Sequence, residues 1–170
     1  MKLEALFKSE KNKLYTVEGK EILLADCKVL KAETCFAEVK NNCVNIEDFV
    51  CKVEVPWSVV GTEDVGYNEE SLASLRDWLK LIEEKNQFAI IVPLANNNLS
   101  IENKNTLTAS MKHCARRIKD CVSVVGFSIP SAFDESDAKA FVEELSEKHS
   151  QYLFFSNNKA LLTDEKIVVF

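Results

Sequence analysis

Residues 50–60 read VCKVEVPWSVV, and this stretch decides the fold class. A valine-rich run with strand-like alternation stops at Pro56, which has no N–H for a sheet ladder, so a strand must finish there. A loop with two glycines follows, then a run with helical spacing, then the apolar run FAIIV at residues 88–92. The order strand, loop, helix, strand is a β-α-β unit and predicts an α/β fold.

The same pattern repeats along the chain. Helical spacing of apolar residues begins after residue 68, after Ser100 (to about residue 120) and after Asp134, with Asn68 or Ser71 as the first cap. Strands are expected at 88–92, 122–129 and 152–155, and two short apolar runs follow at 160–162 and 166–170. Residues 88–92 lack polar alternation, which is typical of a parallel strand covered on both faces. We therefore predict one domain over residues 1–170, with a mainly parallel sheet of about five βα units.

The N-terminal quarter reads differently. Residues 3–8 and 13–17 predict short strands around a polar turn, and the Glu18-Gly19 turn leads into a further apolar run. This indicates an N-terminal β-hairpin followed by a first core strand at about residues 24–30. Residues 31–48 carry only weak helical periodicity, so a short first helix is expected there.

Composition restricts the class of protein. The chain has 170 residues, 46% hydrophobic and 28% charged, which suits one globular domain. A net charge of −6 argues against a nucleic-acid partner, and the basic cluster of Lys112, Arg116, Arg117 and Lys119 is interpreted as a solvated helix face. No apolar run is long enough to span a membrane, and no signal peptide is recognised, so the expected location is the cytoplasm.

The six cysteines and two histidines show no metal-site spacing. No Cys-x-x-Cys pair occurs, so the cysteines are interpreted as small buried thiols, with a thiol pair or an oxidised form as the alternative. His113 is expected to be exposed or hydrogen-bonded on the surface of a helix. No glycine-rich phosphate loop or Ser/His/Asp order stands out. We expect no metal and no cofactor.

Several segments in order resemble a known family. They are GKEILL at 19–24, VEVPWS at 53–58, GYN at 66–68, FAIIVP at 88–93, and ARRIKD at 115–120 with VVGF at 124–127. Together they resemble the N-terminal half of TIM-barrel glycoside hydrolases of the cellulase and β-galactosidase kind, over about residues 14–130. The resemblance implies a partial, half-barrel arrangement of the sheet. The alternative fold is an open doubly wound sheet unrelated to hydrolases.

The chain departs from this family where its chemistry lies. In the family the fourth strand ends in Asn-Glu-Pro, and that glutamate is the general acid/base; here the matching place reads IPSA at 129–132, with Ser131 near the glutamate's position. A serine hydroxyl cannot act as an acid near pH 7 as a carboxyl with a raised pKa can. The family's second carboxylate is on a late strand that has no counterpart here. The resemblance therefore implies that the carboxylate pair used in glycoside hydrolysis is missing.

A few residues remain candidates for a site. Glu54 alternates with Val53 and Val55, so it faces the barrel interior or mouth if the sheet curves, either as a catalytic carboxylate or as a buried partnered one. Trp57 is either a sugar-stacking platform or a packing residue at the base of a loop. The remaining candidates, all expected to line a binding cleft at the strand ends, are Asn96, Asn97, Asn98 and Ser131. The loop carboxylates Glu63, Asp64, Asp134 and Glu135 are interpreted as solvated or capping groups.

Two functions follow from these observations. The first is a degenerate glycoside-hydrolase-like domain, noncatalytic, that binds a glycan or acts as a protein-interaction module. The second is a glycoside hydrolase that uses noncanonical carboxylates such as Glu54, or that is completed by another chain. About five strands cannot close an eight-stranded barrel, so open sheet edges predict a protein partner or a homo-oligomer.

Overall fold

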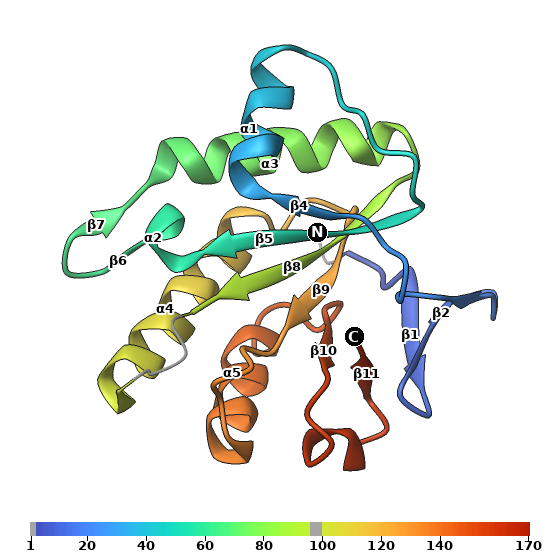
Figure 1. Ribbon diagram of the computed structural model, residues 1–170, viewed down its shortest axis with the longest axis vertical. Helices are drawn as coiled ribbons and strands as arrows, with labels where there is room; N and C mark the ends of the chain where they lie inside the picture. Colours follow the sequence, from blue (N-terminus) through green and yellow to red (C-terminus); the bar gives the residue numbers. More distant parts are fainter. Residues whose placement is uncertain (1–2, 96–99) are drawn as a thin grey trace.

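The computed structural model describes residues 3–95 and 100–170 and is built on one six-stranded sheet (Figure 1). All neighbouring strands of this sheet are parallel, as predicted, and its six strands are joined by five crossovers, in agreement with about five βα units. Their order across the sheet is β4 (Val29–Lys31), β5 (Val50–Pro56), β8 (Phe88–Leu94), β9 (Val124–Ser128), β10 (Leu153–Ser156) and β11 (Ile167–Val169).

The strand order excludes the doubly wound alternative. Strands follow one another across the sheet in chain order, without the reversal that defines a doubly wound sheet. Because every crossover therefore runs in the same direction, right-handed connections place all the helices on one face. Within the described residues the sheet is an open segment of a TIM-barrel-like arrangement and does not close into a barrel (Figure 1).

The helices cover the outer face of this sheet. One apolar cluster joins side chains from every α-helix to the outward residues of the strands, such as Val53, Ile91 and Phe127. The helices are α1 (Ala32–Lys40), α2 (Trp57–Val60), α3 (Glu69–Glu84), α4 (Ile101–Arg117) and α5 (Glu135–Ser146), with a 3-10 turn η1 (Leu161–Thr163). The side chains of Asn68, Ser100 and Asp134 each accept a backbone N–H three residues on, which confirms these residues as helix caps.

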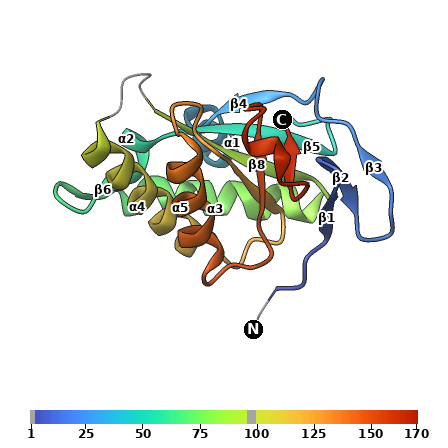
Figure 2. The same ribbon diagram turned by 90° about the horizontal axis from the view of Figure 1, so that it is seen from below.

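A second, antiparallel sheet covers the inner face. It comprises β1 (Phe7–Glu10), β2 (Lys13–Thr16) and β3 (Glu21–Ile22). Phe7 and Leu14 pack with the inward residues Val50, Ile90 and Phe155 in a separate apolar cluster. The predicted hairpin is therefore present; we call β1–β3 the plug, and Figure 2 shows it beside the amino-terminal end of β5. The first core strand is Val29–Lys31 rather than 24–30, because residues 24–28 lead from this plug to the main sheet.

The main sheet is strongly curved. Lys52 on β5 and Phe170 after β11 are four strands apart, which in a flat sheet would separate them by about 19 Å. The Nζ atom of Lys52 nevertheless lies 4.1 Å from the centroid of the Phe170 ring. The sheet therefore wraps around its inner face as an arc of a barrel, which brings the carboxyl ends of its strands toward a common mouth.

The outer edge of β11 is held by a single residue of the plug. Asn12 adopts a left-handed backbone conformation with φ of 61° in the turn between β1 and β2. Its side-chain Nδ2 donates to the carbonyl oxygens of Asp164 at 2.8 Å and Ile167 at 2.7 Å. Its backbone oxygen also accepts from the N–H of Val169 at 2.9 Å. This turn thus occupies part of the edge at which a further parallel strand would continue the sheet.

A small antiparallel excursion lies between β5 and α3. The chain forms α2, then β6 (Gly61–Thr62) and β7 (Gly66–Tyr67), which pair with each other. Gly61 has a φ of 85°, and a side chain there would collide with the backbone of Gly66 and Tyr67. This excursion places Tyr67 against α4.

Candidate functional site

A cleft lies at the carboxyl ends of β8, β9 and β10, where a parallel α/β sheet places its ligand sites. We call it the strand-end cleft. Its volume is about 470 Å³, within the range of small-molecule sites. Its lining residues come from the last residues of these strands, from the segments after them, and from the residue that follows β11. They are Val92, Pro93, Leu94, Ser128, Ile129, Pro130, Ser131, Phe133, Phe155, Ser156, Asn157, Asn158, Leu161 and Phe170.

The lining is mainly apolar, with polar side chains but no charged ones among the described residues. Hydroxyl groups of three serines and the amides of Asn157 and Asn158 face rings of phenylalanine and proline, and no charged side chain from residues 3–95 or 100–170 is among them. The side-chain oxygen of Asn157 accepts from the N–H of Phe170 at 3.3 Å, and that of Asn158 accepts from the N–H of Ala160 at 3.0 Å. These bonds fix the two amides in the cleft wall. Such a surface can bind hydroxyl groups and apolar faces of a neutral ligand.

Glu54 lies on the inner face of β5, as the alternation predicts. It is half-buried and stands in register with Val92 of β8, whose side chain lines the cleft. Glu54 itself does not line the cleft, and within the described part of the chain it makes no side-chain hydrogen bond or ion pair. Its place is therefore on the inner face of the curved sheet, level with Val92 on the neighbouring strand but outside the cleft lining.

The other predicted site residues are only partly brought together. Ser131 is exposed and lines the strand-end cleft. Trp57 begins α2 and packs, partly buried, against the helix-side core rather than in the cleft. Asn96, Asn97 and Asn98 lie outside the described residues.

Of the residues that line the cleft, the sequence analysis named only Ser131 as a site residue, and Asn157, Asn158 and Phe170 are among those that it missed. Asn157 and Asn158 follow β10 directly, and Phe170 follows β11. The available signal was the polar pair after an apolar strand, since the ends of parallel strands gather ligand-binding groups. Phe170 could not be found this way, because only the curvature of the sheet brings it to the mouth.

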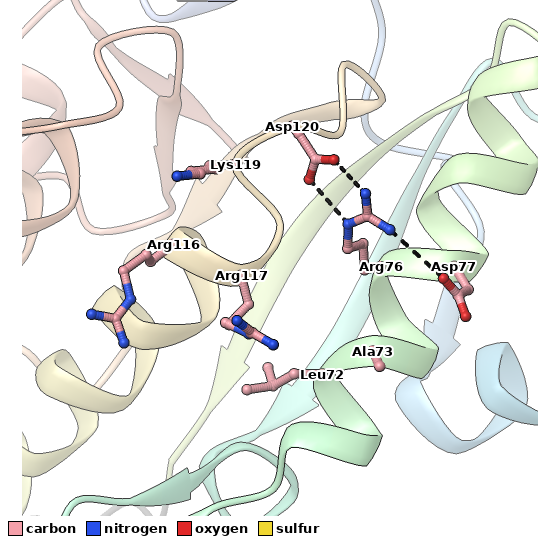
Figure 3. A pocket seen from close by; sticks show the side chains of 8 residues that line it. All are labelled: Leu72, Ala73, Arg76, Asp77, Arg116, Arg117, Lys119 and Asp120. Atoms are coloured by element: carbon pink, nitrogen blue, oxygen red, sulfur yellow. Dashed lines mark hydrogen bonds and ion pairs between the residues drawn. The ribbon is translucent and has the colours of Figure 1, made fainter. Parts of the chain in front are cut away.

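A second cavity, of about 650 Å³, lies between α3 and the end of α4 (Figure 3). Arg76 donates from Nε to one carboxylate oxygen of Asp120 at 3.1 Å and from its Nη2 to the other. Asp77 lies 3.9 Å from the same guanidinium. The pairing of Arg76 with Asp120 therefore joins α3 to the chain after α4. The cavity is also lined by Arg117, which pairs with Glu69 outside the lining, and by Arg116 and Lys119, which form no ion pair in the described part of the chain.

His113 agrees with its prediction only in part: it is hydrogen-bonded, as one alternative had it, but it is buried on α4 rather than exposed. Its ring is stacked on Tyr67 with centroids 3.7 Å apart. The Nε2 atom of His113 lies 2.9 Å from Oε1 of Glu69. The burial comes from the excursion between β5 and α3, which no local pattern in α4 could indicate.

The cysteines are reduced and mainly buried, in agreement with the thiol interpretation. Cys35, Cys51, Cys114 and Cys121 are all buried, and burial raises the pKa of the Cys51 thiol to about 12. Such thiols are protonated and unreactive at neutral pH.

Among the residues that the structure describes, no group of three or more potential metal ligands gathers, and no helix combines the length and apolar character needed to cross a membrane.

Sequence comparison places the chain in no family: no family model matches it, and no curated protein matches it either. Solved structures do match. Endoglucanase Cel5A of Pseudomonas stutzeri, in complex with cellobiose, superposes with a TM-score of 0.55 at 18% identity over 78% of this chain and 45% of the enzyme. The fold is that of a partial glycoside hydrolase barrel. A second structure of the same endoglucanase gives the same TM-score and identity and covers 46% of that enzyme.

The similarity to the glycoside hydrolases concerns the fold. The chain spans less than half the length of the endoglucanase that it matches. GH5_18 from Bifidobacterium longum subsp. longum aligns over 78% of this chain at 8% identity with a TM-score of 0.48. The resemblance expected from the short motifs of residues 14–130 is thus confirmed at the level of a partial glycoside hydrolase fold, while activity depends on the site itself.

Proposed function

We propose that the protein binds a neutral carbohydrate in the strand-end cleft and does not hydrolyse it. The observation that carries this proposal is the lining of the cleft: serine hydroxyls, asparagine amides and aromatic rings, with no charged side chain among the lining residues from 3–95 or 100–170. Neutral sugars present hydroxyl groups and apolar C–H faces, which such a surface matches. Hydrolysis by the usual route needs two carboxylates flanking the scissile bond, and no carboxylate side chain, Glu54 included, is among the described residues that line the cleft.

Binding is tested with a glycan array, followed by calorimetric titration of the neutral oligosaccharides that bind. Phe170→Ala removes an aromatic ring from the cleft and is expected to weaken binding about tenfold. Asn157→Ala removes an amide that also holds the backbone of Phe170, and about fivefold weaker binding is expected.

The matched control is Phe49→Ala. Phe49 is 44% exposed and packs near Phe7 and Phe88, away from the cleft. Its truncation removes the same ring and should leave sugar affinity unchanged. Equal losses in Phe49→Ala and Phe170→Ala, or no binding by the unmodified chain, would refute the proposal.

Hydrolysis is tested separately with chromogenic glycosides. We expect no turnover by the unmodified chain. Turnover that disappears in Glu54→Gln would instead establish an unusual glycoside hydrolase with Glu54 as an essential carboxylate. Trp57→Ala serves as a second probe: because Trp57 packs on the helix side, its loss should lower stability rather than sugar affinity.

A second candidate function is assembly with another protein or another copy of the chain. A groove lies between residues 22–25 and β11, lined by apolar side chains that include Ile22, Leu23 and Val169. Leu23 is 78% exposed and Val169 is 48% exposed. This groove occupies the open side of the sheet, where contact with a partner would bury both side chains.

A further inference from the structure

His149 is a buried imidazole that faces a cavity. It follows α5, is 8% exposed, and lines a cavity of about 320 Å³ between the excursion β6–β7, α4 and α5. We call this cavity the α4–α5 groove. Within the described residues the ring nitrogens of His149 have no hydrogen-bond partner. These nitrogens are accessible from the groove, because the fully buried side-chain polar atom left without a partner in the described residues is Oε1 of Gln87, so a ligand or solvent in the groove can reach them.

Arg116 is held in a fixed orientation beside this groove. A carboxylate only accepts hydrogen bonds, so the bond between Glu69 and His113 places the ring proton of His113 on Nε2. The Nδ1 atom of His113 then accepts from a terminal nitrogen of Arg116 at 2.9 Å. The ring of Tyr67 stacks on the ring of His113, with an angle of 4° between the two ring planes. The remaining donors of the guanidinium are free to bind a ligand.

More positively charged side chains lie near His149 than there are carboxylates to pair with them. Arg116, Lys119 and Lys148 form no ion pair with a carboxylate in the described part of the chain. Figure 3 shows Arg116 and Lys119 extending away from the Arg76–Asp120 pair, so they do not belong to the ion pairs between α3 and α4. Of the two carboxylates that line the groove, Glu144 is already paired with Lys112, which leaves Glu63.

We propose that the α4–α5 groove binds a small tetrahedral oxyanion of the phosphate or sulfate class, with Arg116, Lys148 and His149 as its ligands. Guanidinium groups donate pairs of hydrogen bonds that match such oxygens, and a lysine adds a point charge. A groove of about 320 Å³ is large enough for an anion that is part of a small phosphorylated or sulfated molecule. This site is separate from the strand-end cleft and does not depend on carbohydrate binding.

The charges around His149 predict how binding depends on pH. Burial lowers the pKa of His149 below its ordinary value of 6.5, and the charges of Lys119 and Lys148 lower it further. The other titratable groups facing the groove or the ring are Glu63, Tyr67, Lys112, His113, Arg116, Glu144 and Tyr152. His149 is therefore neutral at pH 7, and a bound dianion favours its protonated form. Affinity should rise as the pH falls from neutral through the lowered pKa of His149, because protonation then adds a charged donor.

The test uses inorganic sulfate, whose charge is constant over this pH range. Sulfate is titrated into the full chain at low ionic strength while the ring signals of His149 and the Nε signal of Arg116 are followed by NMR. We expect saturable shifts of both residues, a raised pKa of His149 in the presence of sulfate, and tighter binding at about pH 5.5 than at about pH 7.5. Acetate, which carries one charge and a planar group, should bind more weakly.

Three variants separate the site from general charge effects. Arg116→Gln should weaken sulfate binding about tenfold, since it removes charge-assisted hydrogen bonds, and Lys148→Gln about threefold. The matched control Lys139→Gln removes the same charge from the exposed side of α5, where Lys139 is 78% exposed, and should leave affinity unchanged. Circular dichroism confirms that each variant is folded. The absence of saturation, equal losses in all three variants, a pH-independent affinity, or acetate binding as tight as sulfate would each overturn the proposal.

Discussion

At the scale of single residues, β9 depends on a glycine. Gly126 is paired with Leu153 of β10, next to a register irregularity between β8 and β9. A Cβ atom at Gly126 would overlap the backbone carbonyl of Leu153, and strand backbones in a packed sheet cannot move aside as a flexible side chain can. The glycine therefore allows β9 and β10 to approach closely just before the strand-end cleft.

We expect Gly126→Ala to lower the free energy of unfolding by about 2–3 kcal/mol, because the added methyl group forces the two strands apart. Denaturant unfolding measures the change. The matched control is Gly66→Ala: Gly66 has a φ of 92° but nothing within 4 Å of the added Cβ, so only backbone strain of about 1–2 kcal/mol applies. A loss in Gly126→Ala no larger than that in Gly66→Ala would show that the sheet accommodates the methyl group.

At the scale of elements, the hairpin β1–β2 and strand β11 are joined chiefly by Asn12. Its side chain binds two carbonyl oxygens around β11, and its backbone binds two further groups there. Because β11 carries Phe170 to the cleft, the hairpin influences a site that lies far from it in sequence. The strength of this junction can be measured locally.

We expect Asn12→Gly to speed hydrogen exchange of the amides of β11 by about tenfold or more. Glycine keeps the left-handed backbone conformation without strain but removes both side-chain hydrogen bonds, each worth about 1 kcal/mol. Amides of β5, in the interior of the sheet, should exchange at an unchanged rate. The control is Lys11→Ala, since Lys11 also has a positive φ, of 51°, and makes no such bonds. Uniformly faster exchange across the sheet would argue against a local junction.

At the scale of the whole molecule, the open side of the sheet is the surface that a partner could cover. The plug covers the inner face and part of the edge of β11, but the groove beside residues 22–25 keeps apolar side chains in contact with solvent. We expect a concentration-dependent dimer in sedimentation velocity if this groove is an interface. Leu23→Asp should then shift the chain to monomer, because a charge cannot be buried there without a partner.

The matched control for this experiment is Val65→Asp. Val65 is 83% exposed in the turn between β6 and β7, so the substitution adds the same charge to an exposed apolar position elsewhere. It should leave the association unchanged. Only monomer at high concentration would exclude self-assembly through the open side.

The sequence by itself determined the local elements and their order. Alternation in VCKVEVP, helical spacing after residue 68 and the caps Asn68, Ser100 and Asp134 act within a few residues, so they predict β5, α3, α4 and α5 directly. Strands that alternate with helices imply a parallel sheet, and the run of short motifs indicated a partial glycoside hydrolase fold. The family resemblance, rather than local periodicity, singled out Ser131 after a strand end, and in the structure it lines the cleft.

Only the tertiary structure decided which distant residues share a site. The strand order and the curvature of the sheet bring Phe170 to Lys52 and into the same cleft as Ser131, although no sequence pattern links these positions. Likewise, His113 is buried because Tyr67 and Glu69 arrive from another element. The physical reason is that periodicity and capping report contacts between near neighbours in the chain. The lining of a cleft depends instead on long-range packing, which is determined by how all the strands and helices fit together.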